Sequence, residues 1–435
     1  MQQNRIDPLV STTAATRTAR EVLSSPRFWL APIVVVAALM SLLSALYLGG
    51  IVNPRENLHD FPIMLVNEDA GSSAAGAPQN FGQDIVRALS EGIDEDKVSL
   101  LQSNTAESEA KMASAEAFGA IVIPRNFTEQ ALALARGVSS SDPIVKPTIT
   151  VTTNPRTGSF GVSLLQSITG PALEKVNTAL GDTLSVAVAQ RAQRSGIEIS
   201  GAALISISEP VTVATTAFAP LPDGSGNGLS AFYYALLLVL AGFTGATTVN
   251  ALVDGFLGFT RTEFGPRVVD RLPVSISRSG TLFVKWIVMV ALAFVVSGLY
   301  LWVSSALGMP VARGTGLYLF GVFAISAIGI TATAVMAAFG TVGLIVNLVV
   351  FIVLAIPSSG GTLPLEASPQ WYGKLAAFEP MHQIFLGVRS LLYFDGRLDA
   401  GLSRALLMAG AGLGIGLVLG IVSTLVYDRK GFERS

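Results

Sequence analysis

The sequence of 435 residues contains no cysteine and only two histidines, His59 and His382. Without cysteine, neither a disulfide nor a thiolate metal site nor a cysteine nucleophile can form. Two histidines so far apart in sequence are also too few ligands for a zinc site of the usual kind. Charged residues are scarce as well, at 13% of the chain, compared with about 25% in soluble domains. We therefore expect much of the protein surface to face something other than water.

Sequence motifs for catalysis are missing too. The chain has no G-x-x-x-x-G-K-[ST] loop for nucleotide phosphates, and neither a G-x-S-x-G elbow nor an H-E-x-x-H zinc motif. Its net charge of -2 gives no support to a nucleic-acid partner. The sequence therefore predicts a protein that is not an enzyme, with no catalytic, cofactor-binding or metal-binding residues.

Six apolar segments are predicted to span a membrane as helices, because about 20 apolar residues cross the hydrocarbon core. They cover residues 28–50, 229–252, 282–306, 316–338, 341–356 and 404–427. The first segment has an alternative reading as a cleaved signal peptide. Its apolar run exceeds the roughly 7–15 residues of such a peptide and no A-x-A site follows, which favours a retained anchor. Phe339 and Gly340, between the fourth and fifth segments, predict a tight helical hairpin.

Basic residues near the ends of the spans predict the orientation of the chain. They gather in the amino-terminal segment, between the second and third spans, and after the last span: Arg5, Arg17, Arg20, Arg27, Arg261, Arg267, Arg271, Arg278, Arg429, Lys430 and Arg434. The short loop 307–315 on the opposite side has only Arg313. We therefore expect a multi-pass protein of the cell inner (plasma) membrane with both termini in the cytoplasm.

Four regions follow from this count: a cytoplasmic amino-terminal segment (1–27), a first transmembrane helix (28–50), an extracytoplasmic domain (51–228) and a five-helix transmembrane domain (229–435). Strand and helix patterns alternate from residue 61 to 153, which predicts a small α/β domain. Between 157 and 195, apolar residues recur at helical spacing. This long helix is predicted to pack on its own domain, with a second copy as the alternative, and Pro171 is predicted to kink or divide it. The fold class is thus an α-helical polytopic membrane protein of six transmembrane helices, with a large extracytoplasmic α/β domain inserted between the first and second.

Ionisable residues are almost absent from the predicted spans. Only Asp254 and Lys285 approach them, both at the cytoplasmic ends, where extension of long side chains towards water explains such residues. Asn250 and Asn347 are predicted to hydrogen-bond between helices. Because proton-driven exporters generally carry a titratable relay inside the bilayer, proton-coupled drug export is the least favoured function.

A few further residues have predicted structural roles. The adjacent carboxylates Glu68 and Asp69 are predicted to serve a turn or a helix cap rather than acid–base chemistry. Trp371, Tyr372 and Phe378 are expected at the level of the lipid headgroups. Glycines of the last span stand at small-x-x-x-small spacing, which indicates either close helix packing or ordinary flexibility.

Several stretches resemble the YhgE/Pip (phage infection protein) family. Residues 53–71 (NPRENLHDFPIMLVNEDAG) are similar to the family's turn and "lPVAVVNEDxG" strand. Residues 118–127 (FGAIVIPRNF) are similar to its "yAAIVIPxDFS" element, and Thr153-Asn154-Pro155 is similar to its "tNdpxg" step. Bacterial relatives of the fungal nitrosoguanidine-resistance proteins share this beginning. Both groups resemble ABC type-2 permeases, whose pattern is also similar to residues 273–278 and 357–389 here.

The lack of a phosphate loop and of an intramembrane relay, together with this permease-like topology, favours a permease in which two copies form the conduit as a homodimer within the lipid bilayer. A separate ATP-binding subunit would dock at the cytoplasmic face, on residues 12–27 and 254–280, and energise the export of a hydrophobic or amphipathic compound such as a lipid, an envelope precursor or a drug. The alternative is a non-transporting scaffold or receptor, of the phage-receptor or secretion-accessory type, that acts through its external domain. The resemblance carries over no catalytic residue.

Overall fold

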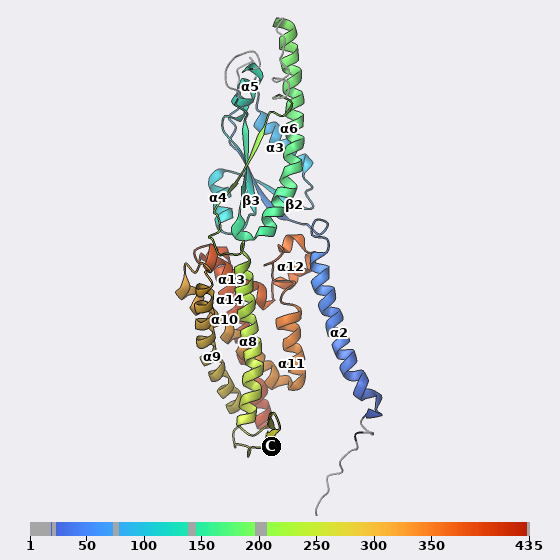
Figure 1. The fold of residues 1–435 in the computed structure, drawn as a ribbon, viewed down its shortest axis with the longest axis vertical. Helices are drawn as coiled ribbons and strands as arrows, with labels where there is room; N and C mark the ends of the chain where they lie inside the picture. Colours follow the sequence, from blue (N-terminus) through green and yellow to red (C-terminus); the bar gives the residue numbers. More distant parts are fainter. Residues whose placement is uncertain (1–18, 20–22, 73–77, 138–144, 196–206, 433–435) are drawn as a thin grey trace, which may run out of the picture.

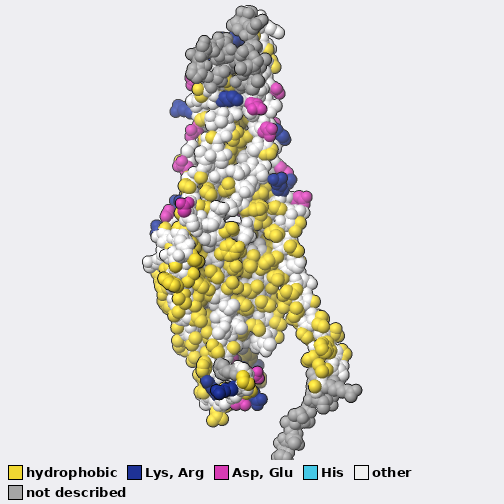
Figure 2. Space-filling view, viewed as in Figure 1, with side chains coloured by type: hydrophobic (Ala, Val, Ile, Leu, Met, Phe, Trp, Pro, Cys, Tyr) yellow, Lys and Arg dark blue, Asp and Glu magenta, His cyan; other side chains and the backbone are white. Residues whose placement is uncertain are grey.

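A computed structural model describes residue 19 and residues 23–72, 78–137, 145–195 and 207–432. Within this part of the chain, five helices are long and apolar enough to cross a membrane, and a five-stranded sheet forms a separate α/β domain. Figure 1 shows the α/β domain stacked on one end of the helix bundle. In Figure 2, hydrophobic side chains dominate the bundle surface, whereas charged side chains gather on the α/β domain and at the far end of the bundle. This distribution indicates a multi-pass membrane protein.

The five long helices match five of the six predicted spans. They are α2 (Pro26–Ile51), α8 (Leu229–Phe256), α9 (Arg278–Ala306), α10 (Gly314–Phe339) and α14 (Ser403–Arg429), the last preceded by the π-helical turn η4 (Leu398–Leu402). Burial differs sharply among these helices: 67% of the most apolar stretch of α10 is buried, against 17% for α14 and 6% for α2. The central member of the bundle is therefore α10, which lies against α8, α9 and α14.

The sixth predicted span, 341–356, is a shorter element. It consists of eight residues of α-helix, α11 (Thr341–Leu348), continued by five of π-helix, η2 (Val349–Val353). At 1.5 Å per residue it reaches about 20 Å, which is less than the hydrocarbon thickness of about 30 Å. The predicted hairpin after α10 is confirmed, since Gly340 turns the chain with a φ of 60°. The predicted count of six full spans is not confirmed, because five helices reach that length among the described residues.

Two glycines of α14 allow close contact with its neighbours. A side chain at Gly416 would meet Thr331 of α10, and one at Gly420 would meet Trp286 of α9. Gly412 and Gly414, in contrast, face open space. Small residues let helix backbones approach closely in membranes. Close helix packing thus explains Gly416 and Gly420 of the predicted pattern, but it does not explain Gly412 and Gly414.

The sheet of the α/β domain has the order β2-β1-β3-β4-β5. Its strands are β1 (Phe61–Asn67), β2 (Val98–Ser103), β3 (Gly119–Ile123), β4 (Thr148–Thr153) and β5 (Thr212–Ala217). Strand β1 runs parallel to β2 and β3, and β4 runs antiparallel to β3 and parallel to β5. Alternate residues of β1 point to opposite faces, so Ile63 and Leu65 join one core and Met64 joins another.

Four helices cover the two faces of the sheet. The larger core is closed by α3 (Phe81–Gly92), α5 (Phe127–Gly137) and α6 (Ser159–Ser195), and the smaller one by α4 (Thr105–Ala113). Leu165, Leu173 and Leu184 of α6 are buried in the larger core, which confirms that this helix packs on its own domain. Pro171 lies inside α6 without dividing it.

The first span touches the rest of the bundle only near its end at the α/β domain, within the described residues. Tyr372 of α12 (Gln370–Ala376) is fully buried and donates to the Leu46 carbonyl at 2.6 Å, and Tyr47 donates to the Ile352 carbonyl at 3.1 Å. Tyr372 thus packs against α2 within the protein, and its expected place at the level of the lipid headgroups stays a prediction. Most other large apolar side chains of α2 are exposed.

Asp69 joins two helices of the α/β domain. One carboxylate oxygen accepts the Thr128 backbone N–H at 3.0 Å, and the other accepts the Gly82 N–H at 3.0 Å and the Thr128 hydroxyl at 2.5 Å. Gly82 lies in the first turn of α3 and Thr128 in the first turn of α5. Backbone N–H groups at these positions have no hydrogen-bond partner inside their own helices, so the two carboxylate oxygens of Asp69 supply one to each. The predicted capping role of Asp69 is confirmed.

We predict that Asp69→Ala lowers the free energy of unfolding by about 2 kcal/mol, since it removes caps from two helices at once. In a domain of this size the melting temperature should fall by about 4–8 °C, measured by circular dichroism of the purified chain in detergent. Glu68→Ala is the matched control, because the adjacent Glu68 is exposed and its side chain bonds only the Thr105 hydroxyl among the described contacts. Equal losses in both variants would contradict the capping role.

Candidate functional site

An apolar hollow in the described bundle, here called the bundle cavity, has a volume of about 320 Å³. It lies between α10, η2, the α12–α13 junction and α14, where α13 is Pro380–Tyr393. Its lining is Ala327, Ile328, Thr331, Val350, Phe351, Phe378, Pro380, Gln383, Ile384, Met408, Ala409, Ala411, Gly412, Leu413 and Ile415. This volume is at the lower end of the range for small-molecule sites, about 300–1,000 Å³.

The wall of the bundle cavity is apolar apart from Thr331 and Gln383. Thr331 donates its hydroxyl to the Ala327 carbonyl at 2.8 Å and lies 3.2 Å from the Gly412 carbonyl, so its polar group is used within the bundle. None of the described lining residues carries a charge. Such a wall suits the apolar part of a molecule and offers no nucleophile or acid–base pair.

Gln383 has one satisfied and one unsatisfied end. Its amide nitrogen donates to the carbonyls of Ala376 at 2.8 Å and Ala377 at 3.4 Å. Its oxygen, Oε1, is buried and has no hydrogen-bond partner among the described residues. Buried polar atoms are nearly always bonded in folded proteins, so this oxygen marks a place where a donor is expected.

A buried ion pair lies at the other end of the bundle, away from the α/β domain. The Lys285 Nζ is 2.7 Å from an Asp254 carboxylate oxygen and donates to the Asn250 side-chain oxygen at 2.6 Å. Lys285 and Asp254 are only 3% and 7% exposed. The expectation that they extend towards water is wrong, because each charge is neutralised by its partner on the neighbouring helix. The predicted role of Asn250 as a hydrogen-bond partner between helices is confirmed.

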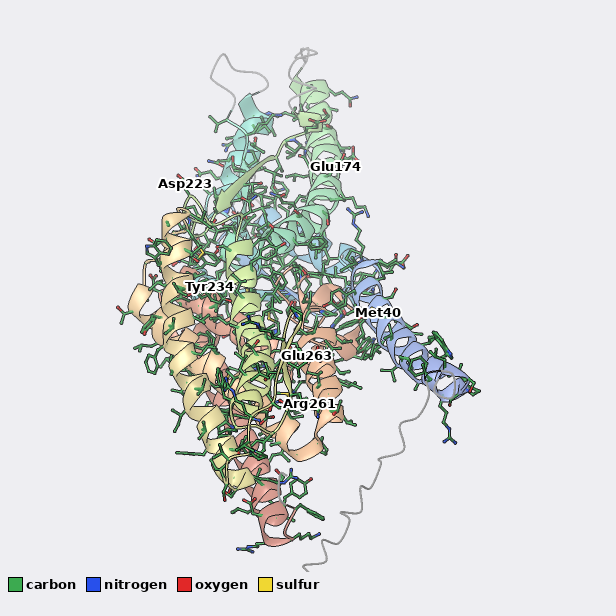
Figure 3. All side chains as sticks on the ribbon, turned by 60° about the horizontal axis from the view of Figure 1, so that its bottom comes forward. Met40, Glu174, Asp223, Tyr234, Arg261 and Glu263 are labelled. Carbon is green, nitrogen blue, oxygen red and sulfur yellow. The ribbon has the colours of Figure 1, made fainter. Side chains whose placement is uncertain are left out.

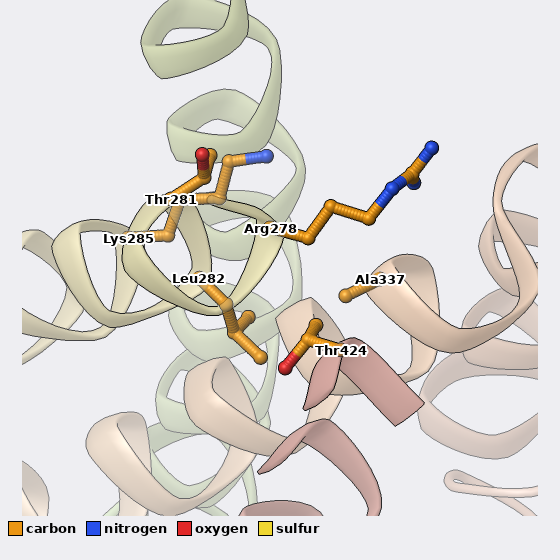
Figure 4. A pocket seen from close by; sticks show the side chains of 6 residues that line it. All are labelled: Arg278, Thr281, Leu282, Lys285, Ala337 and Thr424. Carbon is orange, nitrogen blue, oxygen red and sulfur yellow. The ribbon is translucent and has the colours of Figure 1, made fainter. Parts of the chain in front are cut away.

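Near this pair, a small hollow lies between α9, α10 and α14. Figure 4 shows its lining, with the Arg278 side chain extended away from Lys285. Its volume of about 10 Å³ holds about one water molecule. Asn347 also bonds between helices, as predicted, since its side chain donates to the Ala332 carbonyl of α10 at 2.9 Å. This end of the bundle is therefore tightly packed.

The connection between α8 and α9 forms an exposed surface at the same end. It contains the hairpin β6 (Thr262–Phe264) and β7 (Arg267–Val269), and Figure 3 shows Arg261 and Glu263 on it, with Met40 on α2 apart from the bundle. Leu272 is 91% exposed, and Arg271 stacks on the ring of Phe256 at 4.5 Å. Exposed apolar and basic groups together are typical of a surface that binds another protein. The second candidate docking segment, 12–27, lies mostly outside the described residues.

The carboxyl end of α14 completes this surface, which sequence analysis missed. Asp428 accepts the backbone N–H groups of Arg278 at 2.8 Å and Ser279 at 3.1 Å, and the Ser279 hydroxyl at 2.7 Å. Phe432 accepts from Arg278 at 2.5 Å through its carbonyl. Residues 274–278 line a groove of about 290 Å³ together with Asp428 and Phe432. The sequence signal for this contact was an acidic residue, Asp428, at the end of the last span, where it can lie opposite the start of α9.

A comparison with protein families gives one match over most of the chain. The profile of a family described as "Protein of unknown function (DUF3533)" matches residues 31–409. The chain belongs to this family. The matched range runs from α2 to the first turns of α14, so it includes the α/β domain, Lys285 and much of the bundle cavity. A search of curated proteins found no match.

In this DUF3533 protein, a polar cluster lies beside the bundle cavity where α13 begins. Glu379 accepts the His382 backbone N–H at 3.0 Å, and the His382 ring bonds the Ser359 carbonyl at 2.8 Å. Burial raises the pKa of Glu379 to about 8 and lowers the pKa of His382 to about 4, so both side chains are largely uncharged at neutral pH. The cluster therefore adds little net charge next to the cavity.

Glu379 and Gln383 were not predicted as residues of the site. The local signal for Glu379 was its position before Pro380, since an acidic cap followed by proline begins many helices. Gln383 had no local signal. Its role comes from the carbonyls of the preceding short helix and from the distant segments that close the cavity.

We predict that Lys285→Met strongly destabilises the bundle of this DUF3533 protein, because it leaves the Asp254 charge buried without its partner. Removal of one member of a buried pair costs about 3–5 kcal/mol. The melting temperature in detergent should fall steeply, and Lys285→Met with Asp254→Asn should recover part of the loss.

The control is Arg261→Met, which breaks the exposed pair of Arg261 with Asp270 at 3.1 Å. Exposed pairs contribute little, so this variant should melt like the wild type. A double variant that is no more stable than Lys285→Met alone would show that the pairing does not account for the loss.

Proposed function

We propose that this protein is a permease of the ABC type-2 kind that exports a hydrophobic or amphipathic compound together with a separate ATPase. The resemblance to the YhgE/Pip family supports this proposal. The observation that carries the proposal is the uncharged bundle cavity of about 320 Å³, which opens at the surface of a bundle of membrane-length helices, where Phe378 and Ile415 of its lining are exposed. A polar solute would have to lose its hydration there without compensation, whereas an apolar molecule would not. We further propose a plasma-membrane location with both termini in the cytoplasm and a homodimer as the working unit.

Two features support the need for a partner. The chain has no phosphate-binding loop for ATP, and the buried charges Asp254 and Lys285 are held in a pair. A proton relay would need titratable groups that change their charge during transport, and a tight pair resists that change. The exposed surface around Leu272 and Phe432 is where we place the ATPase.

The cavity is tested by filling it. Gly412 lines the bundle cavity and a side chain there would enter open space, so Gly412→Phe should plug the cavity without disturbing the backbone. Gly414→Phe is the matched control: the same helix, also open at the glycine, but outside the lining. We predict that release of fluorescent NBD-labelled lipids or lipophilic dyes from cells falls at least tenfold in Gly412→Phe.

Release should be unchanged in Gly414→Phe. Undiminished release in a well-expressed Gly412→Phe variant would contradict transport through the cavity. If no probe is released above the background of cells that lack the protein, the scaffold or receptor function is favoured, and the external α/β domain becomes the part to test.

The partner surface has its own test. Leu272→Asp places a charge at a 91% exposed position near the proposed ATPase site, and Leu307→Asp does the same at an 81% exposed position at the opposite end of the bundle. We predict that a nucleotide-binding subunit is recovered with the wild type and with Leu307→Asp by affinity purification from native membranes, and that Leu272→Asp loses it. Equal recovery with both variants would place the partner elsewhere.

A further inference from the structure

We infer that the bundle cavity takes one acyl chain of an anionic membrane lipid, and that Lys374 and Arg404 bind the negatively charged headgroup of that lipid outside the cavity. The lipid comes from the leaflet on the side of the α/β domain. This inference deepens the proposed function by naming the class of substrate, and it rests on that function for its meaning in the cell. Binding itself is a property of the cavity and of the two cations beside it.

The bundle cavity is open to lipid on one side. Phe378 and Ile415 of its lining are 81% and 67% exposed, so an alkyl chain can enter between the α12–α13 junction and α14. Apolar side chains make up most of the wall, which favours an alkyl chain over a hydrated group. The volume of about 320 Å³ is near the lower limit for ligand sites. One chain therefore fits, and the headgroup stays outside.

Arg404 lies on the α14 side of the cavity. Its position is four, seven and eleven residues before Met408, Ala411 and Ile415 of the lining, so by helical spacing all four share one face of α14. Arg404 is the second residue of this helix, whose other end lies with the carboxyl terminus far from the α/β domain (Figure 1). The guanidinium group is therefore placed one helical turn closer to the α/β domain than the cavity wall.

The charge of Arg404 also acts towards α13. Burial chiefly lowers the pKa of His382, and the positive charges of Arg389 and Arg404 lower it further. His382 lies in the first turn of α13, next to Gln383 of the cavity lining. The Arg404 side chain is therefore near the end of the cavity that the start of α13 closes.

Lys374 has the corresponding position on the α12 side. It lies in the last turn of α12, four residues before Phe378 of the lining, and α12 is at the end of the bundle beside the α/β domain (Figure 1). Trp371, one turn earlier, is 47% exposed, and tryptophan is typical of the headgroup level. A lysine just below that level extends its ammonium group towards the headgroups.

Neither cation is neutralised by a carboxylate within the part of the chain that the structure describes. Lys374 and Arg404 are both exposed, and the ion pairs of the described residues include neither of them. Asp399, five residues before Arg404, is paired with Arg397 at 2.6 Å. Two such cations beside one apolar cavity favour an anionic headgroup over a zwitterionic one, which brings a positive charge of its own.

The two parts of the site together select a lipid rather than a free anion. Exposed charges in water hold a small anion weakly. Burial of an alkyl chain against the cavity wall adds affinity in proportion to the apolar area removed from water or from the headgroup layer. An anionic headgroup and an alkyl chain on one molecule use both contributions.

The test uses the purified full chain in phosphatidylcholine nanodiscs. A phosphatidylglycerol with a diazirine in the middle of one acyl chain is photolysed, and labelled residues are mapped by mass spectrometry. Labels are expected on residues 327–331 of α10 and 408–415 of α14. Unlabelled phosphatidylglycerol should reduce this labelling about tenfold more effectively than phosphatidylethanolamine at equal mole fraction, because each cation favours the anionic headgroup. Inorganic phosphate in the buffer should leave the labelling unchanged.

Two double variants separate the headgroup contact from the cavity. Lys374→Gln with Arg404→Gln should make the two competitors equal, and each substitution alone should lower the preference to about threefold. Labelling by a diazirine diacylglycerol, which has no charged headgroup, should persist in these variants and show that the cavity is intact. Arg429→Gln with Lys430→Gln removes two exposed charges at the opposite end of α14 and should keep the full preference.

Four outcomes would overturn the inference. These are equal competition by the two lipids in the wild type, and a preference that survives Lys374→Gln with Arg404→Gln. Displacement of the probe by inorganic phosphate would show a site for free anions instead of a lipid. Labels that map only to the outward faces of α2 or α9 would show ordinary bilayer lipid.

The outcomes also separate this inference from the proposed function. Labelling that Gly412→Phe abolishes, with export unchanged in the same variant, would sustain the lipid site and refute transport through it. Export that Gly412→Phe blocks, with no preference for phosphatidylglycerol in the wild type, would refute the role of Lys374 and Arg404 and leave the permease standing.

Discussion

The structure depends on one constraint, the burial of backbone polar groups in an apolar surrounding. A chain in lipid has no water for its amides and carbonyls, so each spanning segment must be a helix that satisfies them internally. Side chains then decide how those helices meet. In this protein α10 takes the centre and is 67% buried over its apolar window, and the other long helices except α2 are arranged around it.

The cavity is a consequence of an incomplete arrangement around α10. The arm formed by α11 and η2 is too short to cover α10 along its length, and the early glycines of α14 supply no side chains to fill the space. What remains is closed at one end by the start of α13, where Gln383 and Glu379 lie.

The apolar runs could be read from the sequence because lipid burial depends on length and composition alone. Residues 341–356 have the same composition as a span, so their shortness as a helix, with a π-helical end, was not visible. The burial of α6 was predictable from spacing, and the cap at Asp69 from its position after a strand. In each case the information lies within a few neighbouring residues.

Contacts between distant segments were harder to predict. Asp254 lies near the end of one span and Lys285 near the start of the next. Opposite charges at the same depth of consecutive helices indicate an ion pair, whereas the prediction that these side chains extend towards water considered each residue by itself. The residue type of Tyr372 indicates a depth in the membrane but not its partner, which is a carbonyl more than 300 positions away. Gln383 depends on four segments at once, and nothing in its neighbourhood distinguishes it.

The bond between Asp428 and the start of α9 has a mechanical consequence. Asp428 accepts hydrogen bonds from the amides of Arg278 and Ser279, and it lies in the last turn of α14, the same continuous helix that carries Gly412 past the cavity. A push on the loop that precedes Arg278 would thus be transmitted along a single lever to the cavity wall about 16 residues away, or roughly 24 Å at 1.5 Å per residue.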